Sequence, residues 1–406
     1  MTTMLLANVP ATRRGSGAPT AIFRDVTPNL FTTVMGTGIV ATAAATLPVQ
    51  FVGLRVFATI VWASAAFVMI ALTVALAVHW TVHRVHALAH AANPVTVQFY
   101  GAPPMALLTV GAGAELLGGD ILGNATAMAV FATLWTAGTV LGVLASVTVP
   151  YLMITTHDHT DVAALPAWLI PVVPPMVSAS TGALLLPHVA PGQGRSAMLV
   201  GCYALFGLSL VVGMLTVALV YGRLLHRGAP AAQAAPTIWI TLGIVGQSVT
   251  AAVLLGNDAA LVFTGDDATI ATGLRVFGIV HGLVMGGFGV FVFALAAAVT
   301  MRSLRREPSF SMSWWSFTFP IGTCVTGATA LGGALGSAAV DAVAVVLYVV
   351  LVSAWAVVVA RTVCSLTSTR APRVGARRSS AGRCRHVERS TPSRATGRGR
   401  GNAPAP

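Results

Sequence analysis

Lysine is absent from this sequence, and charge of either sign is scarce. Of its 406 residues only 8% are charged, whereas 56% are hydrophobic and the mean hydropathy is +0.82. Soluble domains carry roughly 25% charged residues, so this composition excludes a sizeable soluble domain. Apolar runs of about 20 residues, the length that crosses a hydrocarbon core, fill most of the chain instead. The composition therefore predicts a polytopic membrane protein.

Cysteine is scarce as well. The four cysteines show no metal-ligand or disulfide spacing: Cys202, Cys324, Cys364 and Cys384. They predict neither a disulfide framework nor a zinc site. A cleavable signal peptide is not predicted, because Arg13 and Arg14 are followed by a polar Gly/Ser/Pro stretch. The first apolar span is expected to act as an uncleaved insertion signal, and no cofactor is predicted.

The apolar runs predict an all-α fold with ten transmembrane helices. Expected spans are 28–47, 56–80, 101–118, 125–154, 163–187, 196–225, 238–257, 273–301, 315–335 and 338–365. Together they make one transmembrane domain, 28–365. The flanking segments 1–27 and 366–406 are rich in Arg, Ser, Gly, Pro and Ala, a composition typical of disordered tails.

Arginine placement predicts the orientation. With the N-terminus in the cytoplasm, 20 of the 23 arginines lie inside, and only Arg55, Arg195 and Arg275 lie outside. This bias obeys the positive-inside rule and requires an even number of spans. We expect a protein of the inner (plasma) membrane with both termini cytoplasmic. Its Arg-rich C-terminal tail then lies near anionic lipid, and RNA binding by the tail is a secondary alternative.

Proline divides the spans into two kinds. Nine prolines lie in the odd-numbered spans and one in the even-numbered spans. Helix-breaking residues survive in a bilayer only where protein or water satisfies the freed backbone groups. We therefore expect the odd spans to surround an interior and the even spans to face lipid, as five hairpins. The alternative is that the small residues of the odd spans serve close helix packing.

The expected interior has no fixed charge at the centre of any odd span. It offers hydroxyl and amide groups instead: Thr37, Ser178, Ser180, Thr181, Gln247, Ser248, Thr250, Thr323, Thr326 and Thr329. Such dipoles solvate an anion without trapping it. Breaks near Pro171, Pro174, Pro175 and Pro320 are also expected to expose helix N-termini, although they free carbonyls too. The pattern weakly favours a path for small anions.

Histidine clusters offer a different interpretation. His79, His83, His86 and His90 are spaced to share one helical face, which is typical of a metal site, a pH sensor or a solvated extension of the second span. His157, Asp158, His159 and Asp161 form a second cluster. His281 lies deep in a span, as a hydrogen-bonded core residue or a proton relay. A membrane-embedded metalloenzyme is therefore the alternative from another functional class, although no metal site is predicted.

Four motifs carry a family resemblance. They are VMGTGIVA (34–41), FYGAPPM (99–105), WLIPVVPPM (168–176) and WWSFTFPIGT (314–323). Together they resemble the tellurite-resistance/dicarboxylate transporter family, which also includes plant slow anion channels, yeast malate permeases and sulfite efflux pumps. The resemblance covers about 28–365 and neither tail.

The resemblance implies five hairpins around a quasi-five-fold pore, a homotrimer, and transport rather than enzymatic activity. It also implies a phenylalanine gate on the ninth helix, with Phe319 as the candidate and Phe317 as the fallback. C4-dicarboxylates such as malate are the favoured substrate, and an inorganic-anion channel or a sulfite or tellurite-related exporter is the alternative. The residues expected to line the pore are Gly36, Thr37, Gly38, Pro103, Pro104, Pro171, Pro174, Pro175, Ser178, Gly246, Gln247, Pro320, Thr323 and Thr326.

Overall fold

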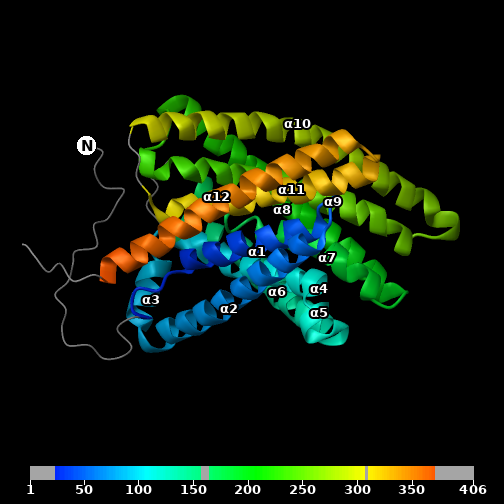
Figure 1. Ribbon diagram of the computed structural model, residues 1–406, viewed down its shortest axis with the longest axis horizontal. Coiled ribbons are helices and arrows are strands. Elements are labelled where there is room, and N and C mark those ends of the chain that lie inside the picture. The colour runs from blue at the N-terminus through cyan, green and yellow to red at the C-terminus, as the bar shows by residue number, and fades with distance from the viewer. Residues whose placement is uncertain (1–22, 157–163, 307–309, 371–406) are drawn as a thin grey trace, which may run out of the picture. The chain divides into compact units, whose positions relative to one another are not determined.

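The computed structural model describes residues 23–156, 164–306 and 310–370, and every regular element within these ranges is a helix (Figure 1). The predicted all-helical class is confirmed. By length and composition, six described stretches can cross a membrane: Val52–Val82, Asn124–Thr156, Gln193–Arg227, Ala232–Leu261, Gly265–Arg305 and Ala338–Ser365. The other predicted spans contain shorter α-helices, of which one precedes the long stretches in sequence and three lie between them.

Five long helices form an outer layer: α2 (Val52–Val82), α6 (Asn124–Thr156), α8 (Gln193–Arg227), α10 (Ala268–Arg306) and α12 (Ala338–Arg370). In the most apolar window of each, only 22–33% of residues are buried. Large apolar side chains on these helices point outward, as Phe67, Ile154 and Val290 do with exposures above 70%. Apolar residues exposed over such a length are suited to contact with lipid.

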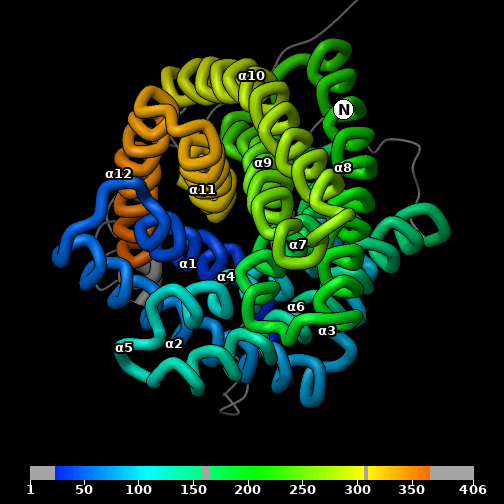
Figure 2. The backbone as a smooth tube through the Cα atoms, turned by 90° about the vertical axis from the view of Figure 1, so that its right-hand side faces the viewer, coloured from blue at the N-terminus to red at the C-terminus, as the bar shows by residue number. Residues whose placement is uncertain are grey.

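Five inner helices lie inside that layer: α1 (Phe31–Thr46), α4 (Ala102–Leu117), α7 (Pro174–Leu185), α9 (Ile240–Asp258) and α11 (Thr318–Leu335). Figure 2 shows them surrounded by α2, α6, α8, α10 and α12. Each inner helix packs against the next, and α11 packs back onto α1, so the ring is closed. In the stretch that contains α9, 94% of the most apolar window is buried.

A 3-10 helix leads into each inner α-helix: η2 (Pro28–Leu30), η3 (Val97–Gly101), η4 (Pro166–Leu169), η6 (Ala232–Trp239) and η9 (Met312–Phe317). Prolines sit in the first turn of α4 and of α7. Proline is compatible with this position because its missing N–H has no partner within the helix there. The α-helical parts thus begin at the breaks expected around Pro174 and Pro320.

Consecutive inner and outer helices pack as pairs, α1 with α2, α4 with α6, α7 with α8 and α9 with α10. A tight turn joins α11 to α12, where Gly336 takes the left-handed conformation (φ 61°) that favours glycine, and donates its N–H to the carbonyl of Gly332. Short helices complete the connections: α3 (Arg84–Ala91), α5 (Gly119–Leu122), η5 (Leu186–His188), η7 (Ala259–Leu261) and η8 (Gly265–Asp267).

This compact unit extends to Thr362. A second unit, Val363–Pro406, is described only over the last turns of α12, which ends at Arg370. Most of the predicted N-terminal tail and the predicted C-terminal tail beyond Arg370 lie outside the described residues.

Candidate functional site

A small cavity lies where all five inner segments meet. Its volume is about 30 Å³, and it is lined by Thr32, Met35, Phe99, Met105, Ile170, Val173, Ile240, Gly243, Trp315, Ser316, Phe319 and Pro320. Four of the inner helices or their 3-10 leads contribute at least one of these residues, and the fifth segment contributes Ile170 and Val173, which link η4 to α7. A space of this size holds about one water molecule, so the path between the inner helices is closed at this level.

The lining residues come from the first turns of the inner helices. Ile240 and Gly243 begin α9, Phe319 and Pro320 begin α11, and Val173 is the residue that precedes α7. Five helix N-termini therefore converge on one cavity. Each N-terminus carries a partial positive charge from its aligned peptide dipoles. The cavity has no charged side chain among its lining residues.

Phe319 lies at this closure. Its side chain is 2% exposed, and Pro320 beside it also lines the cavity. Phe317 lies elsewhere: its ring centroid is 5.0 Å from that of Trp239 and 5.5 Å from that of Trp314. The two phenylalanines are therefore in different surroundings, one in the cavity wall and one in an aromatic cluster.

Polar residues follow on the same helical faces. On α9, Gln247 and Thr250 lie four and seven residues after Gly243, and on α11, Thr323 and Thr326 lie at the same spacings after Phe319. Residues at these spacings share one face of a helix. The apolar cavity is thus followed by a polar belt, which we define as Ser180, Gln247, Thr250, Thr323 and Thr326; all but the half-buried Thr326 are buried.

Contacts within the polar belt join neighbouring inner helices. Gln247 donates its side-chain amide to the hydroxyl of Ser180 on α7. The amide oxygen of Gln247 is buried and has no hydrogen-bond partner within the described ranges. Thr323 donates to the carbonyl of Pro320 at 2.7 Å, and Ser180 donates to that of Val177 at 3.0 Å. Such local bonds are weak, so the hydroxyl protons can turn toward an anion at low cost.

Several predicted glycines lie in helix contacts. A Cβ at Gly36 would come within 3.0 Å of the Trp315 ring, one at Gly38 within 2.8 Å of Thr109, and one at Gly246 within 2.5 Å of the backbone of Thr323. These glycines allow neighbouring inner helices to approach closely. Thr37 accepts a hydrogen bond from the Trp355 indole at 3.2 Å, which links α1 to α12.

The predicted prolines divide between two positions. Pro320 lines the cavity, whereas Pro104 and Pro174 turn toward Gly142 of the outer helix α6, where an added Cβ would lie 3.8 Å and 2.8 Å from their Cβ atoms. Of the remaining predicted residues, Pro103, Pro171 and Pro175 lie in or just before the first turns of α4 and α7, and Ser178 lies in the second turn of α7. Ser178 donates to the carbonyl of Pro174 at 3.2 Å.

The sequence interpretation missed most of the cavity wall. Met35, Met105, Ile170 and Ile240 are ordinary apolar residues, and nothing in their type distinguishes them from packing residues. Phe99 and Trp315 do carry a signal, since each belongs to the aromatic opening of an inner segment. The repeated position of these aromatics could have been used to find them.

The predicted histidine face is wrong as stated. The second helix ends at Val82, and His83 breaks the helical path with φ −115° and ψ 39° before α3 begins. The chain then folds back enough to bring His90 Nδ1 to 3.3 Å from His79 Nε2. His79 is 1% exposed and bonds the carbonyl of Phe23 at 3.0 Å, so it is not part of a solvated extension.

The other titratable groups of the metal hypothesis are placed as follows. The His157–Asp161 cluster lies outside the described residues. Among those described, no three or more His, Cys, Asp or Glu side chains come together to hold a metal ion. His281 Nε2 lies 3.1 Å from the hydroxyl of Ser248, as expected for a hydrogen-bonded core histidine.

Comparison with known proteins decides the family. The family model for voltage-dependent anion channels, SLAC1, matches residues 25–363. The chain belongs to the SLAC1 family. It is therefore a membrane protein of an anion channel and transporter family, with an anion as its cargo and the lipid bilayer as its surroundings. The resemblance drawn from the four motifs is confirmed.

Three proteins similar to this SLAC1-family chain are named as transporters or efflux pumps. It is 28% identical over 345 residues to a sulfite efflux pump of Arthroderma otae, covering 83% of this chain and 89% of the pump. An uncharacterized transporter of Methanocaldococcus jannaschii is 27% identical over 354 residues, covering 84% and 93%. A sulfite efflux pump of Candida albicans is 25% identical over 336 residues, covering 78% and 68%.

Proposed function

We propose that this chain conducts small inorganic anions, with sulfite as the first candidate, along the axis between its five inner helices. The observation that carries the proposal is the cavity at which all five segments meet with their N-terminal ends. Helix N-termini stabilise negative charge. The polar belt then supplies hydroxyl and amide dipoles beyond the cavity.

Phe319 is the proposed gate. Its aromatic ring blocks a narrow apolar passage by size, and a rotamer change would open it without breaking a hydrogen bond. The surrounding wall is apolar on several sides, through Met35, Met105 and Ile170, so the closed passage also resists wetting. Phe317 packs with Trp239 and Trp314 and is the weaker candidate.

We also propose a membrane arrangement from the packing of the inner and outer helices. The five inner segments, extended by their 3-10 leads, cross the bilayer together with the five outer helices as five hairpins. Arginine placement supports cytoplasmic termini in a plasma membrane. The homotrimer implied by the family resemblance stays a prediction, for which analytical ultracentrifugation in detergent is the direct measurement.

C4-dicarboxylates are the second candidate substrate. A dicarboxylate brings two negative charges into the path, and binding it tightly requires cationic partners. Neither the cavity wall nor the polar belt contains one. This favours weakly bound small anions, as in a conducting channel, and it leaves malate to be decided by direct measurement.

Flux into proteoliposomes tests the proposal. Sulfite, chloride, nitrate and malate are compared in the wild type, Phe319→Ala and Phe317→Ala. Removing the gate is expected to raise flux by about tenfold or more, the factor given by ~1.4 kcal/mol of barrier. Phe317→Ala, a matched loss of one ring two residues away, is expected to leave flux unchanged.

Three outcomes would contradict parts of the proposal. Equal flux in the wild type and Phe319→Ala removes Phe319 as the gate. Saturable malate uptake that needs a proton gradient, without sulfite flux, favours a dicarboxylate carrier. If neither variant conducts any anion, although its unfolding temperature shows that it is folded, the anion path is rejected.

A further inference from the structure

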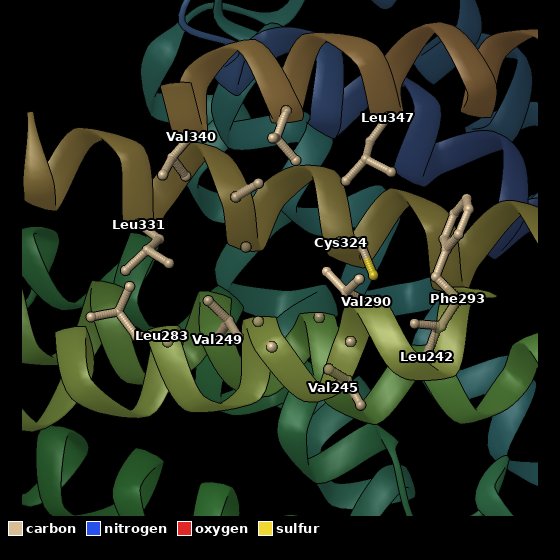
Figure 3. A pocket seen from close by; sticks show the side chains of 18 of the residues that line it. Leu242, Val245, Val249, Leu283, Val290, Phe293, Cys324, Leu331, Val340 and Leu347 are labelled. Atoms are coloured by element: carbon tan, nitrogen blue, oxygen red, sulfur yellow. The ribbon is translucent and has the colours of Figure 1, made fainter. Parts of the chain in front are cut away.

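An apolar groove lies on the membrane-facing side of the molecule, away from the path between the inner helices. Its volume is about 580 Å³, and α9, α10, α11 and α12 all contribute to it (Figure 3). Leu283 and Val290 of α10 and Val343 of α12 form its edges and are more than half exposed. The groove therefore opens to the medium around the two outer helices, which for a membrane protein is lipid.

Glycines of α10 create the groove. Gly282, Gly286 and Gly289 line it at spacings of four and three residues, which is one face of a helix. A Cβ at Gly286 or at the neighbouring Gly287 would meet no atom within 4 Å, whereas one at Gly282 would lie 2.9 Å from Leu331 and one at Gly289 3.2 Å from Val245. The groove is therefore open at Gly286 and Gly287, between two contacts with the inner helices. The floor is formed by inner helices, at Val245 of α9 and Leu331 of α11.

A second pocket, which shares no lining residue with the groove, lies nearer the N-terminal end of α10. It is about 500 Å³ in volume and includes Asn257, Thr272, Arg275 and Gly333. Arg275 lies seven residues before Gly282, on the same face of α10 and about 10 Å along its axis. Within the described ranges no hydrogen bond or ion pair involves the Arg275 guanidinium, and its side chain is exposed.

We propose that these two pockets together bind one phospholipid. An acyl chain fills the apolar groove, and the lipid phosphate is held by Arg275 with the amide of Asn257 beside it. Water is a poor occupant of the groove because its lining offers almost no hydrogen-bonding groups. Each methylene taken from water or loosely packed lipid gains contacts against Val245, Gly286 and Leu331, and guanidinium groups bind phosphate oxygens in pairs.

The mouth of the groove argues for a lipid over a second copy of this chain. A partner helix would need an apolar face along its whole length, whereas the pocket beside this groove contains Arg275, Asn257 and Thr272. A charged, hydrogen-bonding end next to an apolar trough matches a headgroup joined to its acyl chain. Because the trough lies against α9 and α11, the bound lipid would also support two helices of the inner ring.

Native mass spectrometry of the purified full-length protein tests this. The probe is a phosphatidylglycerol added after delipidation, and the wild type is expected to retain one molecule per chain. Gly286→Leu places a side chain in the open groove and is expected to lower lipid affinity about tenfold, a loss of ~1.4 kcal/mol. Arg275→Gln is expected to lower it about fivefold, as for one cation near a membrane surface, and Arg275→Lys by less.

A matched control adds the same side chain elsewhere. Gly201 of α8 also has open space around its Cβ position and lines neither pocket, so Gly201→Leu should bind lipid as the wild type does. If Gly286→Leu does not fold, Gly287→Leu fills the same groove and replaces it. The unfolding temperature of each variant is measured beside the mass spectrum.

Four results would overturn the proposal. If Gly286→Leu or Gly287→Leu retains lipid like the wild type, the groove is not the binding site. Loss of lipid in Gly201→Leu as well would show annular lipid only. Displacement of the lipid by inorganic phosphate alone would show a simple anion site. Loss of oligomer mass in Gly286→Leu with unchanged lipid would make the groove a contact between copies.

Discussion

Thr250 of α9 and Thr326 of α11 place their hydroxyl oxygens 2.9 Å apart. Each hydroxyl also lies within 3.1 Å of a carbonyl on its own helix, that of Gly246 or that of Thr323. One hydroxyl can therefore bond its neighbour while the other bonds its backbone, and either proton can turn away without leaving both oxygens unpaired. The pair links two inner helices. If anions pass here as proposed, it would also offer them a donor.

The close approach of these two helices depends on glycines, among them Gly246 of α9. A Cβ at Gly246 would lie 2.5 Å from the backbone of Thr323 and Cys324, whereas a Cβ at Gly243 has only Pro320 Cγ nearby, at 3.9 Å. Gly246→Ala is therefore expected to lower the free energy of unfolding by about 1–3 kcal/mol, the cost of overpacking. Gly243→Ala, one turn earlier on the same helix, is the control and is expected to unfold like the wild type.

Denaturation in detergent, followed by tryptophan fluorescence, measures both variants. Because Gly243 lines the cavity, its alanine variant is also expected to conduct somewhat less than the wild type. Equal unfolding temperatures for Gly246→Ala and the wild type would contradict the close contact between α9 and α11.

The amide of Gln247 is the strongest hydrogen-bond donor in the polar belt. Gln247→Met keeps the side-chain length and removes the donor. In a Phe319→Ala background, where the gate does not limit flux, we expect anion flux to fall about fivefold, the factor for one hydrogen bond of ~1 kcal/mol. The unfolding temperature should not fall, because the substitution also removes a buried oxygen without a partner.

Gln98→Met is the matched control for Gln247→Met. Gln98 is equally buried, but its amide bonds the carbonyl of Pro94 and the sulfur of Met153, and it lies outside the polar belt. Flux in this variant should equal that of the Phe319→Ala background. A similar fall of flux in both variants would mean that Gln247 acts through folding and not through the path.

The His79–His90 contact predicts a pH dependence outside the membrane. Burial lowers the pKa of His90 below its usual 6.5, and nearby His79 and His86 lower it further, while Asp25 acts in the opposite direction. The folded state therefore favours neutral His90, and the unfolded chain binds more protons. The stability contributed by neutral His90 is full above pH 6.5 and is lost as the pH falls through that value toward the lowered pKa.

Unfolding temperatures between about pH 8 and pH 5, the range in which histidine changes charge, measure this effect. The wild type should lose stability on acidification, and His90→Gln should lose less. His226→Gln removes an exposed histidine at the end of α8 and should keep the wild-type slope. An identical slope in His90→Gln and the wild type would remove His90 as the source.

Local chemistry was readable from the sequence alone. The lack of charge and the length of the apolar runs determined a helical membrane protein. The bilayer core disfavours charge, and a helix needs about 20 apolar residues to cross it. The prolines around 171–175 and at Pro320 marked where the inner α-helices begin, since proline has no N–H to donate and is tolerated in a first turn. The motif at 314–323 singled out Phe319, which lines the cavity.

Only the tertiary structure decided which side of each inner helix faces the cavity. Around the cavity the inner helices are mostly apolar, so residue type there does not show which side faces inward. Pro104 and Pro174 face α6, whereas Met35 and Ile240 line the cavity. The residue types of these four positions predict neither placement. The meeting of His79 with His90 likewise required a break at His83, because distant residues come together through packing and not through spacing.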